Sequence, residues 1–241
     1  MSINRRWVAA VMRKELREYR RNRSIVAAVA IFPLIFLIQP LAAVFVTGRL
    51  SADALGRMHL LLYMLAVPVL SPSILAAYSV TGERQQGSLE PILTTPIRRE
   101  EFLLGKAAAA LAPSTAVAYL VYATFLALVW IFADHAVALA ILQPADIAVQ
   151  VATTPLLATL AIWIGIGIST RVTDVRVAQQ LSLLGALPIV VVTSLTAFDV
   201  IHATQRLAIL GIVALVLADV TGWRIVAPLF DRERLIAGSR S

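Results

Sequence analysis

The sequence lacks cysteine and has little charge. Its 241 residues include no Cys and three His, and Asp, Glu, Lys and Arg together make up only 15%. Without Cys the chain has no disulfides, no thiolate nucleophile and no thiolate metal site. His59, His135 and His202 are far apart in the sequence, which argues against a His-rich metal site. Ordinary soluble domains carry about 25% charged residues, so the composition also argues against a soluble protein.

Long apolar runs are what the sequence has instead, since 59% of its residues are hydrophobic. A helix needs about 20 mostly apolar residues to cross a bilayer core. The sequence therefore predicts an all-α integral membrane protein, one transmembrane domain over residues 1–241, with six spans. The predicted spans are Ile25–Val46, Leu60–Val80, Phe102–Phe132, Ile147–Ser169, Leu181–Phe198 and Leu207–Val226. Lys106 is expected to snorkel from the third span to the interface.

The basic residues predict the orientation of these spans. With the N-terminus inside, eighteen Lys and Arg lie on the inner side, against Arg49, Arg57 and Arg206 outside. The positive-inside rule then places both termini in the cytoplasm. We therefore expect a multi-pass protein of the cytoplasmic membrane. The net charge of +7 is concentrated beside apolar runs. That distribution fits an anionic lipid surface and not a nucleic acid.

The segment before the first span, residues 1–24, is strongly basic. Trp7, Val8, Val11 and Met12 fall near one helical face, which predicts an interfacial helix on the inner leaflet. A solvated basic tail that only sets the topology is the alternative. A cleaved signal peptide is not expected, because residues 13–23, RKELREYRRNR, are charged where a signal peptide is apolar. Residues 231–241 are expected to form a cytoplasmic tail.

Charge is scarce inside the predicted spans. Carriers driven by an ion gradient usually hold ionisable residues near the midplane, and here five of the six predicted spans carry no charge in their central portion, Asp219 in the sixth being the exception. Asp219 is either a residue of the translocation path or an interfacial carboxylate that pairs with Arg224 or Arg176. Gly167-Ile168-Ser169 has the look of a protease motif, but no His lies within a span to act as its base. Packing of small residues between helices, as in Gly165, Gly167 and Ser169, is the ordinary explanation.

One polar island stands out, GERQQGSLEPILTTPIRREEFLLGK, from Gly82 to Lys106. Gly82 is expected to turn the chain out of the second span, so that Glu83 and Arg84 meet the headgroups. Ser88 is a suitable N-cap for a short element that ends at Thr95-Pro96. Arg98–Glu101 then opens the next helix. The residues alone leave two interpretations: a partner-binding element, or an ordinary charged loop.

The island resembles the signature of the type-2 permeases of ATP-binding-cassette (ABC) transporters. The matching residues are Glu83-Arg84, Gly87-Ser88-Leu89-Glu90, Leu93, Thr95-Pro96-Ile97, Glu101 and Leu104-Gly105-Lys106. The segments Arg13-Lys14-Glu15-Leu16 and Phe230-Asp231-Arg232-Glu233-Arg234 resemble the ends of the same family more weakly.

The resemblance implies a permease half-unit that pairs with a second permease copy and binds a separate ATPase subunit. ATPase docking would fall to a coupling helix between spans two and three, at Gly87, Ser88, Leu89, Glu90, Ile92 and Leu93. Glu83 would lie near the interfacial helix at a gate, where Arg13, Lys14 or Arg17 could pair with it. Many relatives also have re-entrant helices between spans five and six. The connection Asp199–Arg206 is so short that such helices would use part of those spans.

The sequence therefore favours a permease subunit with no cofactor and no enzymatic activity of its own. Export is the expected direction, because most of the family exports. No G-x-x-x-x-G-K-[ST] motif occurs, since Gly105-Lys106 is followed by alanines, so a partner must hydrolyse ATP. The alternative is a stand-alone membrane carrier or scaffold. The substrate does not follow from the residues.

Overall fold

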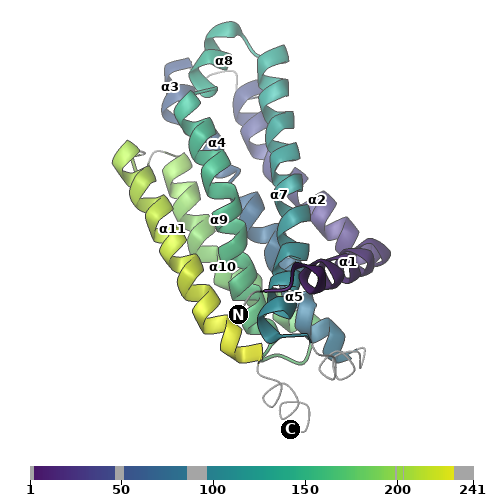
Figure 1. Cartoon of the computed structure of the whole chain (residues 1–241). Helices are drawn as coiled ribbons and strands as arrows, with labels where there is room; N and C mark the ends of the chain where they lie inside the picture. Colours follow the sequence, from purple (N-terminus) through teal and green to yellow (C-terminus); the bar gives the residue numbers. More distant parts are fainter. Residues whose placement is uncertain (1–2, 47–51, 86–96, 199, 203, 231–241) are drawn as a thin grey trace.

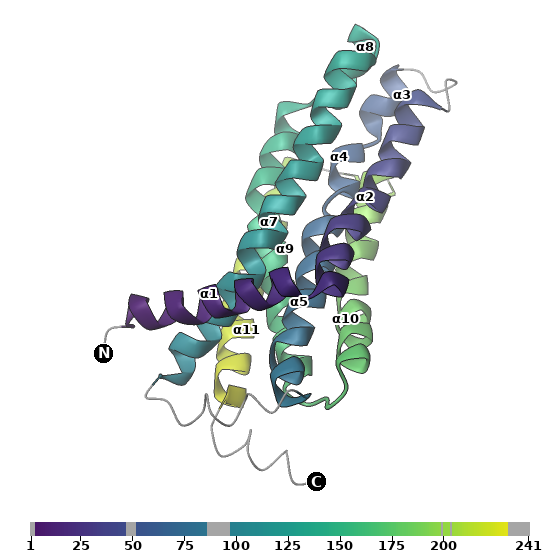
Figure 2. The ribbon, with the colours of Figure 1, turned by 90° about the vertical axis from the view of Figure 1, so that its right-hand side faces the viewer.

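A computed structural model gives the architecture of the chain. It describes residues 3–46, 52–85, 97–198, 200–202 and 204–230, and this part of the chain contains helices and no strand. Long helices run side by side in a bundle, and one helix crosses the bundle near its lower end (Figures 1 and 2). The predicted all-α membrane fold is confirmed, and six helical segments are long and apolar enough to cross a membrane.

The six spans agree with the prediction to within a few residues at most ends. They are Arg23–Phe45, Leu60–Glu83, Arg99–Phe132, Pro144–Ser169, Val175–Ala197 and Gln205–Leu229. The fifth begins earlier than the expected Leu181, because the Asp174 carboxylate caps it by accepting hydrogen bonds from the N–H groups of Arg176 (2.8 Å) and Val177 (3.1 Å).

These spans correspond to named helices. The helices are α2 (Arg23–Phe45), α4 (Leu60–Tyr63) with α5 (Ala66–Gln85), α7 (Arg99–Phe132), α9 (Pro144–Ser169), α10 (Val175–Ala197) and α11 (Gln205–Val226), which η1 (Ala227–Phe230) follows. Both α10 and α11 are continuous, so neither contributes a re-entrant helix.

The second span forms the centre of the bundle. In its most apolar window 94% of the residues are buried, against 6% in the sixth span. Helix α5 packs against α9, α10, α7 and α2, whereas α11 packs mainly against α9. The outward side chains of α11, among them Leu210, Val213 and Leu217, remain exposed.

A break divides the second span into α4 and α5. Pro68 has no N–H to donate to the Met64 carbonyl, and that carbonyl instead accepts from Val67 (3.1 Å). Proline is tolerated in the first turn of a helix, so α5 begins at Ala66. The sequence did not predict this interruption, although Pro68 carries its signal.

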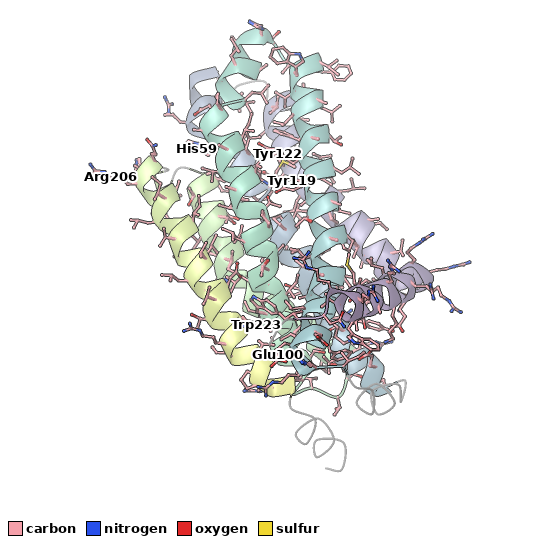
Figure 3. The ribbon with its side chains drawn as sticks, viewed as in Figure 1. His59, Glu100, Tyr119, Tyr122, Arg206 and Trp223 are labelled. Carbon is pink, nitrogen blue, oxygen red and sulfur yellow. The ribbon has the colours of Figure 1, made fainter. Side chains whose placement is uncertain are left out.

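The two ends of the bundle carry different short elements. At one end lie α3 (Ala52–Arg57) and α8 (His135–Ile141), which pack against each other. At the other end lie η1 and α1 (Arg5–Arg21), the crossing helix (Figure 2). We refer to these as the α8 end and the α1 end. Arg206 lies at the α8 end, and Glu100 and Trp223 lie at the α1 end (Figure 3).

The buried face of α1 differs from the predicted one. Val11, Glu15 and Tyr19 are buried, at i, i+4 and i+8, and they face α7. Trp7 is exposed, and Val8 and Met12 are only half-buried. The apolar residues therefore pack on the protein, and the placement of α1 at a membrane surface stays a prediction.

Candidate functional site

Lys106 lies at the centre of a buried ion cluster at the α1 end. Its ammonium is fully buried, donates to Glu15 Oε1 and to the Ser79 carbonyl at 2.7 Å each, and lies 2.9 Å from Glu83 Oε2. The ring of Phe102 covers it from 4.8 Å. The expectation that Lys106 snorkels is wrong. Two carboxylates from other helices hold the ammonium inside the protein.

Glu83 is likewise buried, so the expectation that it meets the headgroups is wrong. Its Oε1 accepts a hydrogen bond from Lys14 of α1 while Oε2 faces Lys106. Lys14 also lies 3.6 Å from Glu15 and 3.2 Å from Glu18. Positive and negative groups thus alternate across α1, α5 and α7, and we call Lys14, Glu15, Glu83 and Lys106 the ion cluster.

The α1 members of the ion cluster are charged near neutral pH. Burial favours a neutral Glu15, but the ammonium groups of Lys106 and Lys14 outweigh burial and lower the pKa of its carboxyl. Burial likewise opposes the charge of Lys14, but Glu83, Glu15 and Glu18 outweigh burial and raise the pKa of Lys14. Burial and then the charge of Glu15 raise the pKa of Tyr19 well above its ordinary value, so Tyr19 stays neutral.

Glu101, Gly105 and Lys106 all serve the docking of α1. Glu101 accepts from the backbone N–H of Asn4 (2.8 Å), just before α1, and from that of Arg98 (3.2 Å). Gly105 leaves room for α1, because a Cβ there would lie 2.6 Å from the Cβ of Val11. One face of the first turns of α7 thus binds α1 in three ways: Glu101 accepts a hydrogen bond at its start, Gly105 allows a close approach, and Lys106 forms an ion pair.

Gly82 does not turn the chain out of the membrane span, contrary to the prediction. Helix α5 continues through it to Gln85. The ring of Tyr78, one turn earlier, covers the glycine, and a Cβ there would lie 2.9 Å from Tyr78 Cζ. The additional turn is what carries Glu83 to the ion cluster.

Ser169 joins α9 to α5 and shows no nucleophile geometry. Its hydroxyl donates to the Ala77 carbonyl (2.7 Å) and accepts from the N–H of Thr81 (2.9 Å). The Thr81 hydroxyl donates to the Ser169 carbonyl (3.0 Å). Gly165, one turn away, lies so close to α5 that a Cβ would be 2.7 Å from that of Ala76. Packing of small residues explains this segment.

The other predicted site residues fall into two groups. Gly87, Ser88, Leu89, Glu90, Ile92 and Leu93, with the proposed coupling helix, lie outside the described residues. Of the three candidate partners of Glu83, Lys14 pairs with it, while Arg13 and Arg17 are exposed on the opposite side of α1. The role of the Lys14–Glu83 pair at a gate stays a prediction.

Asp219 pairs with neither of its candidate partners in the part of the chain that the structure describes. It is half-buried on α11, and no ion pair joins it to Arg224 or Arg176. A role in a translocation path stays a prediction.

The α8 end has a smaller polar contact. His59 Nδ1 lies 2.8 Å from Asp146 Oδ2 and joins the start of α4 to α9. Gln143 donates to the Gly56 carbonyl (2.8 Å) and so holds α3. Within the described ranges, no group of three or more His, Asp and Glu residues has the arrangement of a metal site.

Sequence reasoning missed Glu15 as a site residue and the pairing of Lys106. A signal was present for both. Glu15 lies one turn after Val11 on the less basic side of α1, and Lys106 begins the alanine-rich run of α7. Lys106 is isolated among apolar neighbours, which indicates a buried partner of opposite sign.

Comparisons with known proteins agree with this architecture. No curated protein matches the chain. The model of a family described as "ABC-2 family transporter protein" matches residues 9–215, which extend from α1 into α11 and include every member of the ion cluster. This match covers most of the sequence, and the chain belongs to the ABC-2 family of transporter proteins.

Proposed function

We propose that this membrane subunit, which is not itself catalytic, is driven by a separate ATP-binding-cassette ATPase and exports its substrate. In this proposal α1 and both termini lie on the cytoplasmic side of the cytoplasmic membrane, and two permease copies, identical or related, form the pathway. Family membership supports the ATPase partner, the pairing and the export direction. The concentration of basic residues at the α1 end supports the orientation.

The observation that carries the proposal is that α1 holds both helices that flank residues 86–96. On one side, Glu83 in the last turn of α5 binds Lys14. On the other, Glu101 and Lys106 in the first turns of α7 bind Asn4 and Glu15. A force applied to residues 86–96 would therefore act on α5, α7 and α1 together.

The docking surface for the ATPase is proposed at Gly87, Ser88, Leu89, Glu90, Ile92 and Leu93. A short element with apolar Leu89, Ile92 and Leu93 suits a groove on a partner. Because α5 is the buried centre of the bundle, movement at its end would change the packing of α9 and α10, which contact it. The ion cluster would then act as the joint between ATPase and pathway.

The test is to change the docking surface without touching the bundle. The variant Leu89→Asp/Glu90→Arg is expected to lose the bound ATPase when the tagged chain is purified from its native membranes in mild detergent. Mass spectrometry and ATP hydrolysis in the purified sample measure the loss, and the lost protein must contain a Walker A motif.

The matched control is Leu139→Asp/Asp134→Arg, which makes the same kinds of change at exposed positions of the α8 end. It is expected to retain the ATPase. If both variants keep it, the docking surface is wrong. If the unchanged chain transports in vesicles with no ATPase present, the protein is a stand-alone carrier and the proposal fails.

A further inference from the structure

The side of α1 that faces away from the bundle is basic and hollowed. Arg13, Leu16, Arg17, Arg20 and Arg21 line a hollow of about 550 Å³. The arginines recur every three or four residues, so they form one helical face, opposite the buried face that contains Val11, Glu15 and Tyr19. Among the described residues none of the four arginines has an ion-pair partner, in contrast to Lys14 on the same helix.

The hollow is close to the point where the chain enters the membrane. Asn22 alone separates α1 from α2, the first span. It ends one helix and caps the next, because its side chain accepts from the N–H groups of Ser24 (3.1 Å) and Ile25 (3.3 Å). Arg20 and Arg21, in the last turn of α1, are thereby fixed beside the first turn of a membrane-spanning helix.

We propose that this hollow binds the phosphate headgroup of an anionic phospholipid. Guanidinium groups bind phosphate oxygens through paired N–H donors, and several arginines around one hollow can share a single headgroup. Basic pockets beside membrane-spanning helices are suited to such lipids. Leu16 gives the hollow an apolar part, and exposed Val26 lies in the first turn of α2, just beyond Asn22.

A lipid suits this surface better than an acidic protein does. An acidic protein would have to approach a helix that leads within one residue into a span, so membrane would occupy part of the space it needs. Anionic phospholipid is present at that level in a bilayer. The proposal does not depend on the ATPase, so the permease chain alone can test it.

The experiment compares two pairs of consecutive arginines, one at each end of α1. The full chain in detergent is titrated with phosphatidylglycerol or phosphatidylcholine at equal mole fraction, and bound lipid is counted by native mass spectrometry. Each basic residue near an anionic lipid raises the binding constant for that lipid roughly fivefold. Arg20→Gln/Arg21→Gln is therefore expected to weaken phosphatidylglycerol binding by about 25-fold and to leave phosphatidylcholine binding unchanged.

Arg5→Gln/Arg6→Gln is the matched control. These exposed arginines lie on the same helix, and at 1.5 Å per residue they are roughly 22 Å from the other pair, beyond the screening length at physiological salt. The control is expected to change binding less than twofold. Equal losses in both variants would show a general charge effect and overturn the site. So would a chain that does not prefer phosphatidylglycerol, or an Arg20→Gln/Arg21→Gln variant that binds it normally.

Discussion

The two ends of the bundle use charge differently. At the α1 end, the fully buried Lys106 binds two carboxylates from two other helices. At the α8 end, one pair, His59 and Asp146, joins α4 to α9, and the His59 side chain is 16% exposed. One end is a network of several charges, of which only Lys14, with a side chain 35% exposed, reaches solvent, and the other is a single pair whose side chains are 16% and 9% exposed.

This difference determines how each end responds to damage or force. A buried network has no water to replace a lost partner, so the loss of one group leaves the others uncompensated. A single pair with one partly exposed member, here His59, can take up water in place of a lost partner at smaller cost. We infer that the α1 end has discrete arrangements, intact or open, as a joint requires. The α8 end can adjust gradually.

The largest effect is expected from Lys106→Met. The substitution leaves Glu15 and Glu83 buried with only Lys14 to share, and breaking a buried ion pair costs about 3–5 kcal/mol. Helix α1 should separate from α7. Because the chain has no Cys, a Val11→Cys substitution places a single thiol at a buried position of α1 that can report this. Labelling of that thiol by a maleimide should accelerate at least tenfold when Lys106→Met is added.

Asp146→Asn is the comparison at the α8 end. The amide oxygen can still accept from His59, so the expected loss is about 1 kcal/mol or less, seen as a lower apparent melting temperature. Added to Val11→Cys, it should leave the labelling rate of the thiol unchanged. If Lys106→Met were no more damaging than Asp146→Asn, the two ends would not differ as proposed.

An effect smaller than that of Lys106→Met is expected from Gly105→Ala. The added Cβ would lie 2.6 Å from the Cβ of Val11 and 3.1 Å from the Val8 carbonyl, so α1 must shift away from α7. Overpacking of this kind costs about 1–3 kcal/mol. A thiol at position 11 cannot report this change, because residue 11 is the clashing partner. A Tyr19→Cys substitution, at another buried position of α1, serves instead.

Gly211→Ala is the control for this substitution. No atom lies within 4 Å of the Cβ it would add on α11, so the change should only improve helix propensity, by up to about 1 kcal/mol. An equal loss in both variants would mean that glycine acts through the backbone and not through the docking of α1.

The sequence predicted the spans well and the polar contacts poorly, for one physical reason. A span is a local property, since bilayer thickness fixes its length, and six apolar runs are readable without any partner. The pairing of Lys106 with Glu15 joins residues 91 positions apart. Each charge alone looked like an interfacial residue, because snorkelling is the usual fate of a lysine near a helix end.

The motif residues show the same limit. The resemblance drew attention to Glu83, Glu101, Gly105 and Lys106, but it suggested partners, on the interfacial helix, for Glu83 alone. In the structure all four contact α1 or the residue before it. Glu83 and Lys106 form ion pairs, Glu101 accepts a backbone hydrogen bond, and Gly105 allows a close approach of the two helices. A motif identifies residues that a fold needs. Only the packing of α1 on α7 reveals what Glu101, Gly105 and Lys106 bind.

The smallest effect, and the finest test of the contrast, is the pH dependence of the α1 end. The lowered pKa of Glu15 means that its stabilisation is present above the ordinary range of a carboxyl and lost as pH falls through the folded-state pKa. The raised pKa of Lys14 means that its stabilisation is present below the ordinary range of a lysine and lost only above it. Between about pH 5 and pH 10 neither group changes charge, so the contribution of Glu15 and Lys14 to stability should be constant there.

Other carboxylates also titrate in acid, so the measured quantity is a difference between two proteins. The apparent melting temperature of the unchanged chain in detergent should exceed that of Glu15→Gln by a constant amount from about pH 5 to pH 9. The gap should narrow as pH falls below the ordinary range of a carboxyl, because Glu15 then takes up a proton more readily in the unfolded chain than in the folded protein. If the gap instead narrowed as pH rose from about 6 to about 8, Glu15 would be neutral in the folded protein below that range. The α1 end would then be a hydrogen-bonded contact like the α8 end, and the distinction between a brittle joint and an adjustable one would disappear.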